Sequence, residues 1–382
     1  MTAGARDPAA AGTVGQSVPL GVTMAPLGTA GPAGIVQVAR VAEQCGLSSL
    51  WVAEASSCES FVTLAAVAAV TERIGLSTGV VPLQLRTPAL LAMSVATLLQ
   101  AAPDRLLNIG IGFSSPAIVA RWHGAEYSSR PIAQMREFVA VLRACLSGEK
   151  VRFTGDFYRV DGFRLGLPVD MDRVKILVAA LNPQMLTLAG EVADGVLLNY
   201  LPLSQVDWAI GHVRAGGPAR IFSYVHGGIG DVEAALPLVR REIFGYLTVD
   251  AYARIFERSG YGAVVQAVRD KAAAGDRPGA LDEIPLELVQ EIKCIGSATD
   301  VRQRLADHVR AGVEQPVLFP LTYGGDPVPG TTALLEALRP GGAAPPDDRG
   351  ATAPVGSRSA GGDPVPAAPS PTEAPHPQTR NR

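Results

Sequence analysis

Short apolar runs alternate with amphipathic stretches of helical length along most of this 382-residue chain. Such alternation is typical of βα units, in which a helix connects two parallel strands. Eight runs have the length and composition of strands: Val18 to Met24, Ser49 to Ala53, Leu76 to Val80, Arg105 to Ile111, Lys175 to Ala179, Gly195 to Leu198, Arg220 to Val225 and Gln315 to Leu318. Eight parallel strands close a barrel filled by side chains, so the sequence predicts an α/β fold, the (β/α)8 TIM barrel.

Glycine and proline mark the ends of the intervening helices. Pro32 lies near the first turn of a predicted helix that ends before Gly46, and Gly75 follows the predicted helix Phe61 to Arg73. A doubly wound sheet is the competing architecture. The sequence Gly110-Ile111-Gly112 follows a predicted strand but lacks the third glycine of the dinucleotide-binding pattern, and G-x-G alone is a weak signal. We therefore favour the barrel.

Composition divides the chain into a folded region and two ends. We predict a barrel over 18–340, with a mostly helical insertion over about 231–292 that is longer than one βα unit needs. A hairpin is expected where Val151 to Phe153 and Phe157 to Val160 flank a Thr-Gly-Asp turn. Residues 1–17 are predicted to be flexible. Residues 341–382 consist mainly of Pro, Gly, Ala, Ser and charged residues and predict a disordered tail.

The charge balance and the cysteine spacing exclude several classes of function. Lys plus Arg is 33 and Asp plus Glu is 36, so no global attraction to nucleic acid or anionic membrane is expected. The four cysteines form no C-x-x-C pair, so neither a structural metal site nor a disulfide framework is predicted. The chain shows no signal-peptide h-region and no apolar run of membrane-spanning length, so we expect a cytoplasmic protein.

In a barrel of this kind, ligands bind at the C-terminal ends of the strands. The residues just after the predicted strands are Thr23, Met24, Glu54, Ala55, Gly79, Val80, Gly112 to Ser115, Ala179 to Pro183, Asn199, Tyr200 and His226. This set is poor in metal ligands and in nucleophile-base pairs. A site of that composition usually depends on a cofactor for its chemistry.

Several blocks in order carry a resemblance to a known family. The blocks are Gly46 to Glu54 (GLSSLWVAE), Leu64 to Gly79 (LAAVAAVTERIGLSTG) with Val80 and Arg86-Thr87-Pro88, Asn108 to Ser114, Ala179 to Met185 and Ala189 to Asn199. Together they resemble the F420-dependent branch of the bacterial-luciferase-like superfamily, and are similar to methylenetetrahydromethanopterin reductases over about 20–320. The resemblance implies an oxidoreductase that moves a hydride with the deazaflavin F420.

The resemblance also assigns roles near the predicted cofactor ring. It implies a cis peptide between Gly79 and Val80 that forms a bulge behind the ring, where the alternative is an ordinary glycine at a strand end. Glu54 lies where the family usually places an acidic residue close to the ring, which makes it a candidate for cofactor binding and for catalysis.

Two further segments suit the polar end of a cofactor. Gly112, Ser114 and Ser115 form a small-residue loop whose N-H groups and hydroxyls suit a polar ligand, although a plain βα turn reads the same way. Ala179, Ala180 and Leu181 lead to Asn182, a predicted N-cap, and Pro183 at the first helical position. The N-H groups and dipole of that helix predict a phosphate site, although N-caps are common.

The sequence departs from the family at three positions that relatives use for chemistry. Two carboxylates of the methylene-transferring relatives fall on Thr23 and Ser115 here, and the histidine of the sugar-phosphate dehydrogenases falls on Ala55. We therefore expect neither reaction, because general-base catalysis needs a histidine or a carboxylate within reach.

What remains is hydride delivery to an activated C=C or C=N bond in a small molecule or modified peptide. His226 is a candidate proton donor, and a structural histidine is the alternative. Asn199 and Tyr200 are predicted on the substrate side, together with Thr23 and Ala55.

Two other functions stay open at this stage. One is an FMN-dependent monooxygenase, because luciferase-like enzymes share the barrel, and the other is a non-catalytic barrel that binds a partner. A homodimer through the apolar helix Phe61 to Val70 is a further possibility, with burial inside one chain as the alternative.

Overall fold

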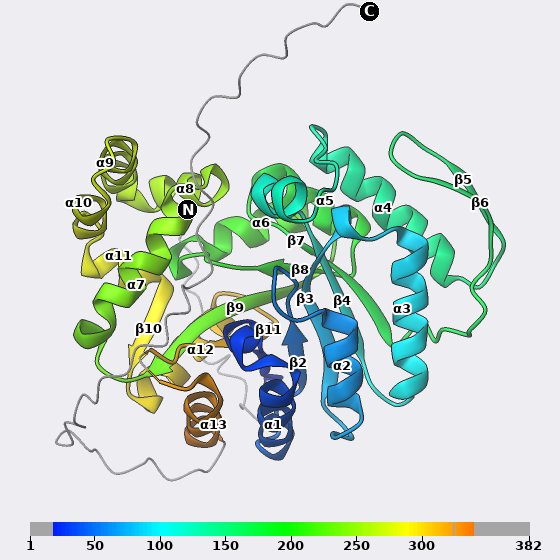
Figure 1. Ribbon diagram of the computed structural model, residues 1–382, viewed down its shortest axis with the longest axis horizontal. Helices are drawn as coiled ribbons and strands as arrows, with labels where there is room; N and C mark the ends of the chain where they lie inside the picture. Colours follow the sequence, from blue (N-terminus) through cyan, green and yellow to red (C-terminus); the bar gives the residue numbers. More distant parts are fainter. Residues whose placement is uncertain (1–17, 324, 340–382) are drawn as a thin grey trace, which may run out of the picture.

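Eight parallel strands form a closed barrel in the computed structural model, which describes residues 18–323 and 325–339 (Figure 1). The strands are β1 (Gly21–Thr23), β2 (Ser49–Val52), β3 (Gly75–Pro82), β4 (Leu107–Gly112), β7 (Val174–Ala179), β8 (Gly195–Leu198), β9 (Arg220–Ile229) and β11 (Gln315–Pro320). Each pairs with the next along the chain, and β11 pairs with β1, so the sheet closes. The predicted (β/α)8 barrel is confirmed. The predicted flexible N-terminus and disordered tail lie outside the described residues.

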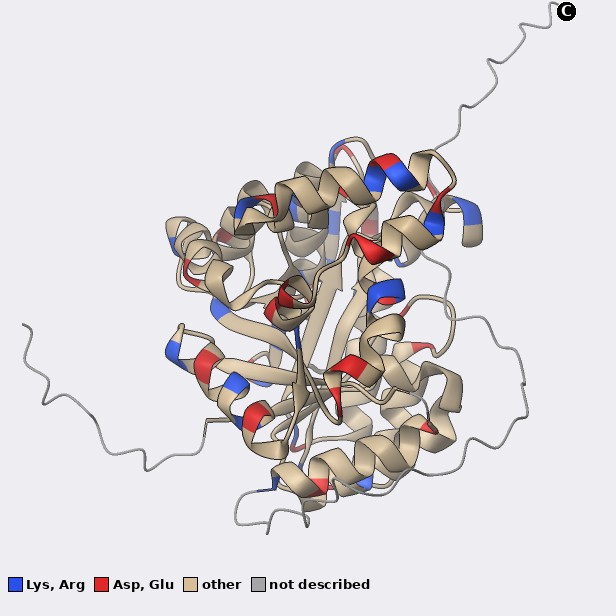
Figure 2. Ribbon diagram, turned by 90° about the vertical axis from the view of Figure 1, so that its left-hand side faces the viewer, with Lys and Arg blue, Asp and Glu red and all other residues tan. Residues whose placement is uncertain are grey.

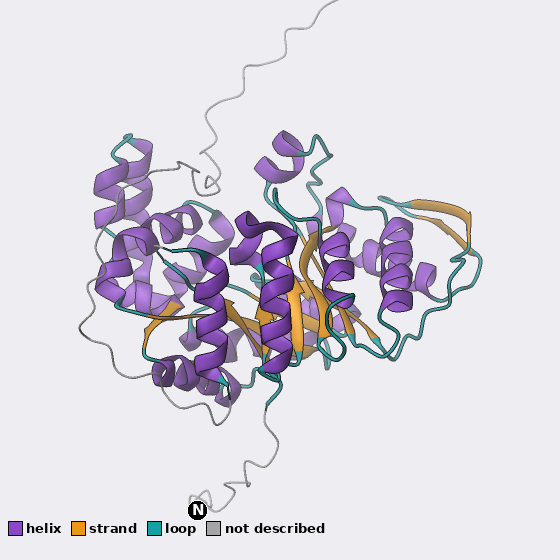
Figure 3. Cartoon of the chain, turned by 60° about the horizontal axis from the view of Figure 1, so that its bottom comes forward, coloured by secondary structure: helices purple, strands orange, loops and turns teal. Residues whose placement is uncertain are grey.

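Helices surround the strands, as Figure 3 shows. They are α1 (Gly31–Gln44), α2 (Ser60–Ala68), α3 (Pro88–Ala101), α4 (Pro131–Leu146), α5 (Pro183–Val192), α6 (Val206–Gly216), α12 (Ala298–Arg310) and α13 (Pro327–Leu338). Local chemistry starts several of them. Thr87 caps α3 by accepting the Leu90 N-H, with Pro88 in the first turn, and Ser297 and Asp300 form a reciprocal capping box on α12.

One excursion leaves the barrel between α4 and β7. It is the antiparallel hairpin β5 (Val151–Thr154) and β6 (Arg159–Phe163), which projects from the side of the molecule in Figure 3. The sequence predicts this hairpin, with its second strand two residues too early. None of the helices within 18–323 and 325–339 is both long and apolar enough to cross a bilayer.

Side chains fill the barrel interior. Trp51, Leu177, Phe222 and Tyr224 form one cluster there, and the Trp51 side chain is fully buried. Trp51 Nε1 donates to Ser49 Oγ at 2.8 Å, so the buried indole has its hydrogen-bond partner. Because this core occupies the interior, we expect a ligand of the barrel to bind at the strand ends.

The insertion between β9 and α12 follows β9 directly and lies at the left of Figure 1. It comprises α7 (Val232–Leu247), α8 (Asp250–Phe256), α9 (Gly262–Ala273), α10 (Arg277–Asp282) and α11 (Leu286–Ile292). It ends in β10 (Lys293–Gly296), which pairs in parallel with the C-terminal part of β9, from His226 to Ile229. The seventh strand predicted from the sequence ends at Val225, and no predicted strand corresponds to β10. The run Lys-Cys-Ile-Gly is too short and too mixed to indicate a strand.

A single carboxylate on α7 joins the insertion to the barrel. Glu242 accepts hydrogen bonds from Lys293 Nζ at 2.6 Å, from the Tyr200 hydroxyl and from Tyr323 Oη at 3.0 Å. Most charged residues lie on the outer helices and loops (Figure 2), whereas the Lys293 side chain is completely buried. Burial opposes ionisation of Glu242, but the ammonium and the two hydroxyls outweigh it, so the pKa of this carboxyl lies below its ordinary value.

Removing only one charge of the Glu242–Lys293 ion pair should lower the free energy of unfolding more than removing both charges. Glu242→Gln leaves the Lys293 ammonium buried without a counter-charge, and we expect a loss of about 3–5 kcal/mol in the free energy of unfolding. The double variant Glu242→Gln with Lys293→Met removes both charges and should regain most of that loss. Denaturant unfolding of the three proteins measures the difference, and additive losses in the double variant would contradict the ion pair.

Candidate active site at the barrel mouth

A bulge interrupts β3 at the mouth of the barrel. The peptide between Gly79 and Val80 is cis, as the resemblance implies, and the pairing of β3 with β4 shifts register between Thr78 and Val81. Tyr224 of β9 donates from its hydroxyl to Gly79 O at 2.6 Å, across the barrel interior. A Cβ on Gly79 would lie 2.1 Å from that hydroxyl oxygen, so only glycine permits this contact. The bulge is thus held from the opposite wall.

The loop after β4 lies beside the bulge. A Cβ on Gly110 would lie 2.3 Å from Thr78 O, and one on Gly112 would lie 2.8 Å from Val80 Cγ2, so both glycines permit close packing against β3. The Ser114 N-H faces Gln84 Oε1 at a long 3.5 Å, while Gln84 Nε2 is buried with no partner. A buried amide donor without a partner is costly unless a ligand or water supplies an acceptor. The Gln84 amide therefore offers an unused hydrogen-bond donor between β3 and the loop after β4.

The two serines of this loop have different surroundings. Ser115 Oγ accepts the Ile118 N-H at 3.3 Å, at the start of the short helix Ala117–Trp122. The predicted small-residue loop of Gly112, Ser114 and Ser115 is present. In this structure the Ser115 hydroxyl is engaged locally.

The start of α5 follows β7 at the next strand end. Asn182 Oδ1 accepts the Met185 N-H at 2.9 Å and Pro183 occupies the first turn, so the predicted N-cap is confirmed. Asn182 and Pro183 are exposed, whereas Ala180 is buried beneath them. Whether this helix start binds a phosphate stays a prediction.

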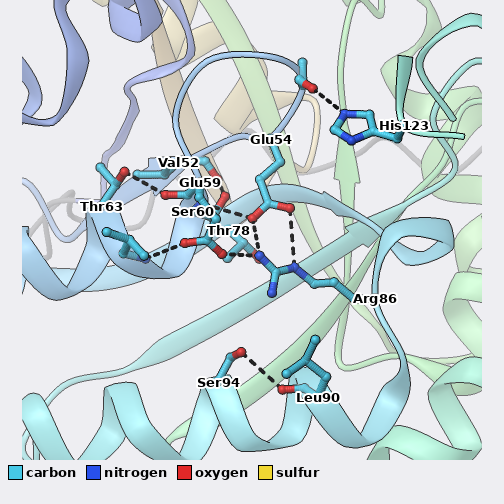
Figure 4. Close-up of polar contacts among 12 residues, drawn as sticks. Val52, Glu54, Glu59, Ser60, Thr63, Thr78, Arg86, Leu90, Ser94 and His123 are labelled. Atoms are coloured by element: carbon cyan, nitrogen blue, oxygen red, sulfur yellow. Dashed lines mark hydrogen bonds and ion pairs between the residues drawn. The ribbon is translucent and has the colours of Figure 1, made fainter. Parts of the chain in front are cut away.

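Glu54 belongs to a compact ionic cluster at the end of β2 (Figure 4). Its carboxylate accepts the Ser60 N-H at 3.0 Å and two bonds from the Arg86 guanidinium, at 2.7 and 3.4 Å. Arg86 also pairs with Glu59. Burial opposes the charge on Arg86, but the two carboxylates outweigh it and raise the pKa of the guanidinium. With these three donors on it, Glu54 is suited to holding the loop after β2 in place.

His123 joins the loops after β2 and β4. Its Nε2 lies 3.0 Å from Ala55 O, as drawn in Figure 4. Ala55 is partly exposed at the mouth. Ala55, which falls on the histidine position of the sugar-phosphate dehydrogenases, therefore contributes only its backbone carbonyl here. The His123 ring, from the segment after β4, contacts that carbonyl.

His226 lies inside β9 and is 2% exposed. Its Nδ1 lies 3.0 Å from Lys293 Nζ and its Nε2 lies 3.0 Å from Asn199 Oδ1, while its ring stacks on Phe319. Burial, with the nearby Lys293 charge, holds the pKa of His226 well below its ordinary value, so the ring is neutral. Both ring nitrogens are engaged. This arrangement corrects the expectation that His226 lies at the end of the seventh strand, and it agrees with the alternative of a structural histidine.

The four residues predicted on the substrate side separate into two pairs. Asn199 and Ala55 are partly exposed at strand ends, as expected. Thr23 is fully buried and donates to Trp51 O at 3.4 Å. Tyr200 is 1% exposed and stacks on Tyr246 of the insertion, with ring centroids 3.6 Å apart. The substrate-side prediction is wrong for Thr23 and Tyr200, because side chains of the interior and of the insertion cover them.

Sequence reasoning missed five side chains that shape this region: Gln84, Arg86, Tyr224, Glu242 and Lys293. Arg86 lies in a block that supports the resemblance, yet its pairing with Glu54 joins residues 32 positions apart. Tyr224 and Lys293 lie in strands and contact residues 145 and 93 positions away. No local pattern predicts such contacts. Within the described residues, no group of three or more His, Cys, Asp or Glu side chains is arranged to hold a metal ion.

Comparison with known proteins places the chain among relatives of this architecture. It is 27% identical over 329 residues to a putative coenzyme F420-dependent oxidoreductase of Mycobacterium tuberculosis, covering 78% of this chain and 94% of that protein. It is 26% identical to the 5,10-methylenetetrahydromethanopterin reductase of Methanolobus tindarius, covering 74% and 89%.

A solved structure confirms the fold. The coenzyme F420-dependent tetrahydromethanopterin reductase of Methanopyrus kandleri superposes with a TM-score of 0.71 at 21% identity, covering 84% of this chain and 98% of that one. The sequence profile described as luciferase-like monooxygenase matches residues 13–315, which is most of the chain. This protein therefore belongs to the luciferase-like monooxygenase family, as its sequence blocks indicate.

Proposed function

We propose that this protein is an F420-dependent oxidoreductase whose cofactor binds at the barrel mouth. The observation that carries the proposal is the Gln84 amide, a buried donor with no partner between the β3 bulge and the β4 loop. Relatives named as F420-dependent enzymes align over most of this chain and support the choice of cofactor.

The residues at the mouth fit a flat, polar-edged ring. Gly112 and Ala179 leave little side-chain bulk at two strand ends, and Val80 is partly exposed beside them. Gln84 supplies an N-H donor, which suits the carbonyl edge of a deazaflavin. The loop around Ser114 and the start of α5 would hold the polar tail of the cofactor. The bound deazaflavin would supply a hydride, and the chain would supply orientation and exclusion of water.

The substrate we propose has an activated C=C or C=N bond, in a small molecule or modified peptide. A dehydrogenase acting on an alcohol needs a general base within reach. At this mouth Glu54 is held by Arg86 and Ser60, and His226 is neutral with both nitrogens engaged. Reduction of an electron-poor bond needs only hydride delivery and a weak acid or water, so this chemistry fits the residues best.

An FMN-dependent monooxygenase is the second candidate. The family profile that matches the chain is described by that activity, and the same mouth would accept a flavin ring. Cofactor binding distinguishes the F420-dependent oxidoreductase from the FMN-dependent monooxygenase. A chain that binds neither cofactor would be a non-catalytic barrel.

A homodimer is also proposed, through the outer faces of α2 and α3. Val62, Leu90 and Met93 expose 68%, 46% and 50% of their surface there. The α2 helix overlaps the apolar stretch Phe61 to Val70 that the sequence offers for a contact between subunits, and it contacts α3.

Cofactor titration tests the proposed function. Oxidised F420 and FMN should each be added to the full chain while cofactor fluorescence and tryptophan emission are recorded. We expect saturable binding of F420 at micromolar concentration and at least about tenfold weaker binding of FMN, a difference of about 1.4 kcal/mol. Tighter FMN binding would favour the monooxygenase. Binding of neither cofactor would favour the non-catalytic barrel and would contradict the proposal.

The variant Gln84→Met tests the unpaired amide. Because its Nε2 has no partner, removing it should leave the free energy of unfolding nearly unchanged and weaken F420 binding about five- to tenfold. The matched control is Gln134→Met on α4, whose amide donates to Tyr158 Oη at 3.1 Å and also has a buried atom without a partner. The control should leave F420 affinity unchanged. Equal F420 affinity in Gln84→Met and the wild type would refute the assigned role.

A further inference from the structure

A continuous polar chain runs from the insertion to the barrel mouth. Glu242 of α7 contacts Lys293 Nζ at 2.6 Å, and the same ammonium lies 3.0 Å from His226 Nδ1. On the other side of the ring, His226 Nε2 lies 3.0 Å from Asn199 Oδ1. The chain begins at a buried ion pair and ends at a partly exposed carboxamide.

Only one hydrogen-bond polarity satisfies every member of this chain. An ammonium group donates and cannot accept, so His226 Nδ1 must accept from Lys293. The ring proton then lies on Nε2 and donates to Asn199, which must present its oxygen to His226. The NH2 group of Asn199 therefore points away from His226, on a residue that follows β8 and is partly exposed. The buried Lys293 ammonium therefore determines that the NH2 group of Asn199, and not its oxygen, is left for another partner.

The ionisation of the chain agrees with that polarity. Burial outweighs the Glu242 carboxylate, so the pKa of Lys293 lies below its ordinary value, and Tyr200 Oη accepts a further bond from Lys293 Nζ at 2.8 Å. The Glu242 carboxylate also accepts bonds from Tyr200 and Tyr323. A buried ion pair with its remaining positions filled in this way can stay charged.

We propose that Lys293 is a positioning residue that holds His226 as the neutral Nε2-H tautomer and thereby presents the Asn199 NH2 group at the barrel mouth. A ligand group that meets Asn199 must then be a hydrogen-bond acceptor, such as a carbonyl oxygen or an imine nitrogen. This last step rests on the proposed function, because it takes the mouth as the ligand site.

A second buried histidine provides an internal control. His308 Nδ1 lies 2.9 Å from the carbonyl oxygen of Arg304, which can only accept, so His308 must carry its proton on Nδ1. The ring is 4% exposed, comparable with His226. The structure therefore assigns opposite tautomers to two histidines of similar burial in one chain.

Nitrogen-15 NMR of the full chain, labelled only at histidine, reads both tautomers. Loss of one ring signal in His226→Gln, and of another in His308→Gln, assigns the two residues. We expect an Nε2-H ring for His226 and an Nδ1-H ring for His308, with the His226 shifts constant between about pH 5 and pH 8. A His226 ring that carries its proton on Nδ1, or that is protonated in this range, would overturn the proposal.

The double variant Lys293→Met with Glu242→Gln then tests the cause. It removes both charges, so it avoids leaving one buried charge unpaired. We expect the pure Nε2-H signal of His226 to be lost in favour of a tautomer mixture or an Nδ1-H ring, with His308 unchanged. A His226 spectrum identical to that of the wild type would show that Lys293 does not set the tautomer. The wild-type measurement decides the tautomer even if the variant fails to fold.

Ligand preference tests the specificity step separately. Cyclohex-2-enone carries an acceptor and cyclohexene does not, and saturation-transfer NMR measures the binding of each. Asn199→Leu should weaken enone binding about two- to tenfold and leave cyclohexene binding unchanged. Unchanged enone binding would overturn the specificity step. The histidine spectra need no cofactor, so a chain that shows the expected tautomers and binds no F420 would refute the proposed function alone.

Discussion

The hydrogen bond from Tyr224 to Gly79 O crosses the interior of the barrel and connects two opposite strands at the level where the mouth begins. It requires glycine at position 79, because any Cβ there would collide with the phenol. The contact fixes the bulge of β3, and the bulge in turn sets how β4 and its loop pack. Gln84, Gly112 and Ser114 owe their mutual arrangement to this support.

A second constraint comes from the insertion. The buried Lys293 and the α7 carboxylate Glu242 join three barrel strand ends to one helix, and the remaining donors of the cluster are tyrosine hydroxyls. The pair costs desolvation energy that a pair of apolar side chains would avoid. Its benefit is directional, because an ammonium group imposes hydrogen-bond polarity on His226 and Asn199. On the proposal above, the insertion thus sets the hydrogen-bond polarity of the residue that follows β8.

The eight barrel strands follow from alternation and turn signals, which are local properties of the sequence. The N-cap at Asn182 and the loop at Gly112 follow from the same kind of signal, and the cis peptide at Gly79 follows from family resemblance. Lys293, Tyr224 and Arg86 could not be predicted, because their partners lie far away along the chain. The sequence predicts His226 at the end of the seventh strand because β10, a four-residue strand, leaves no periodic pattern to indicate that β9 continues beside it. It predicts Tyr200 on the substrate side because nothing in the sequence indicates that Tyr246 of α7 stacks on it.

A crystal structure of the full chain grown with F420 tests the central claim most directly. The account predicts density for the deazaflavin ring at the Gly79-Val80 bulge, with a ring oxygen or nitrogen within hydrogen-bonding distance of Gln84 Nε2. Density for the ring elsewhere, for example in the groove between α7 and α13 lined by Leu238 and Leu334, would contradict it.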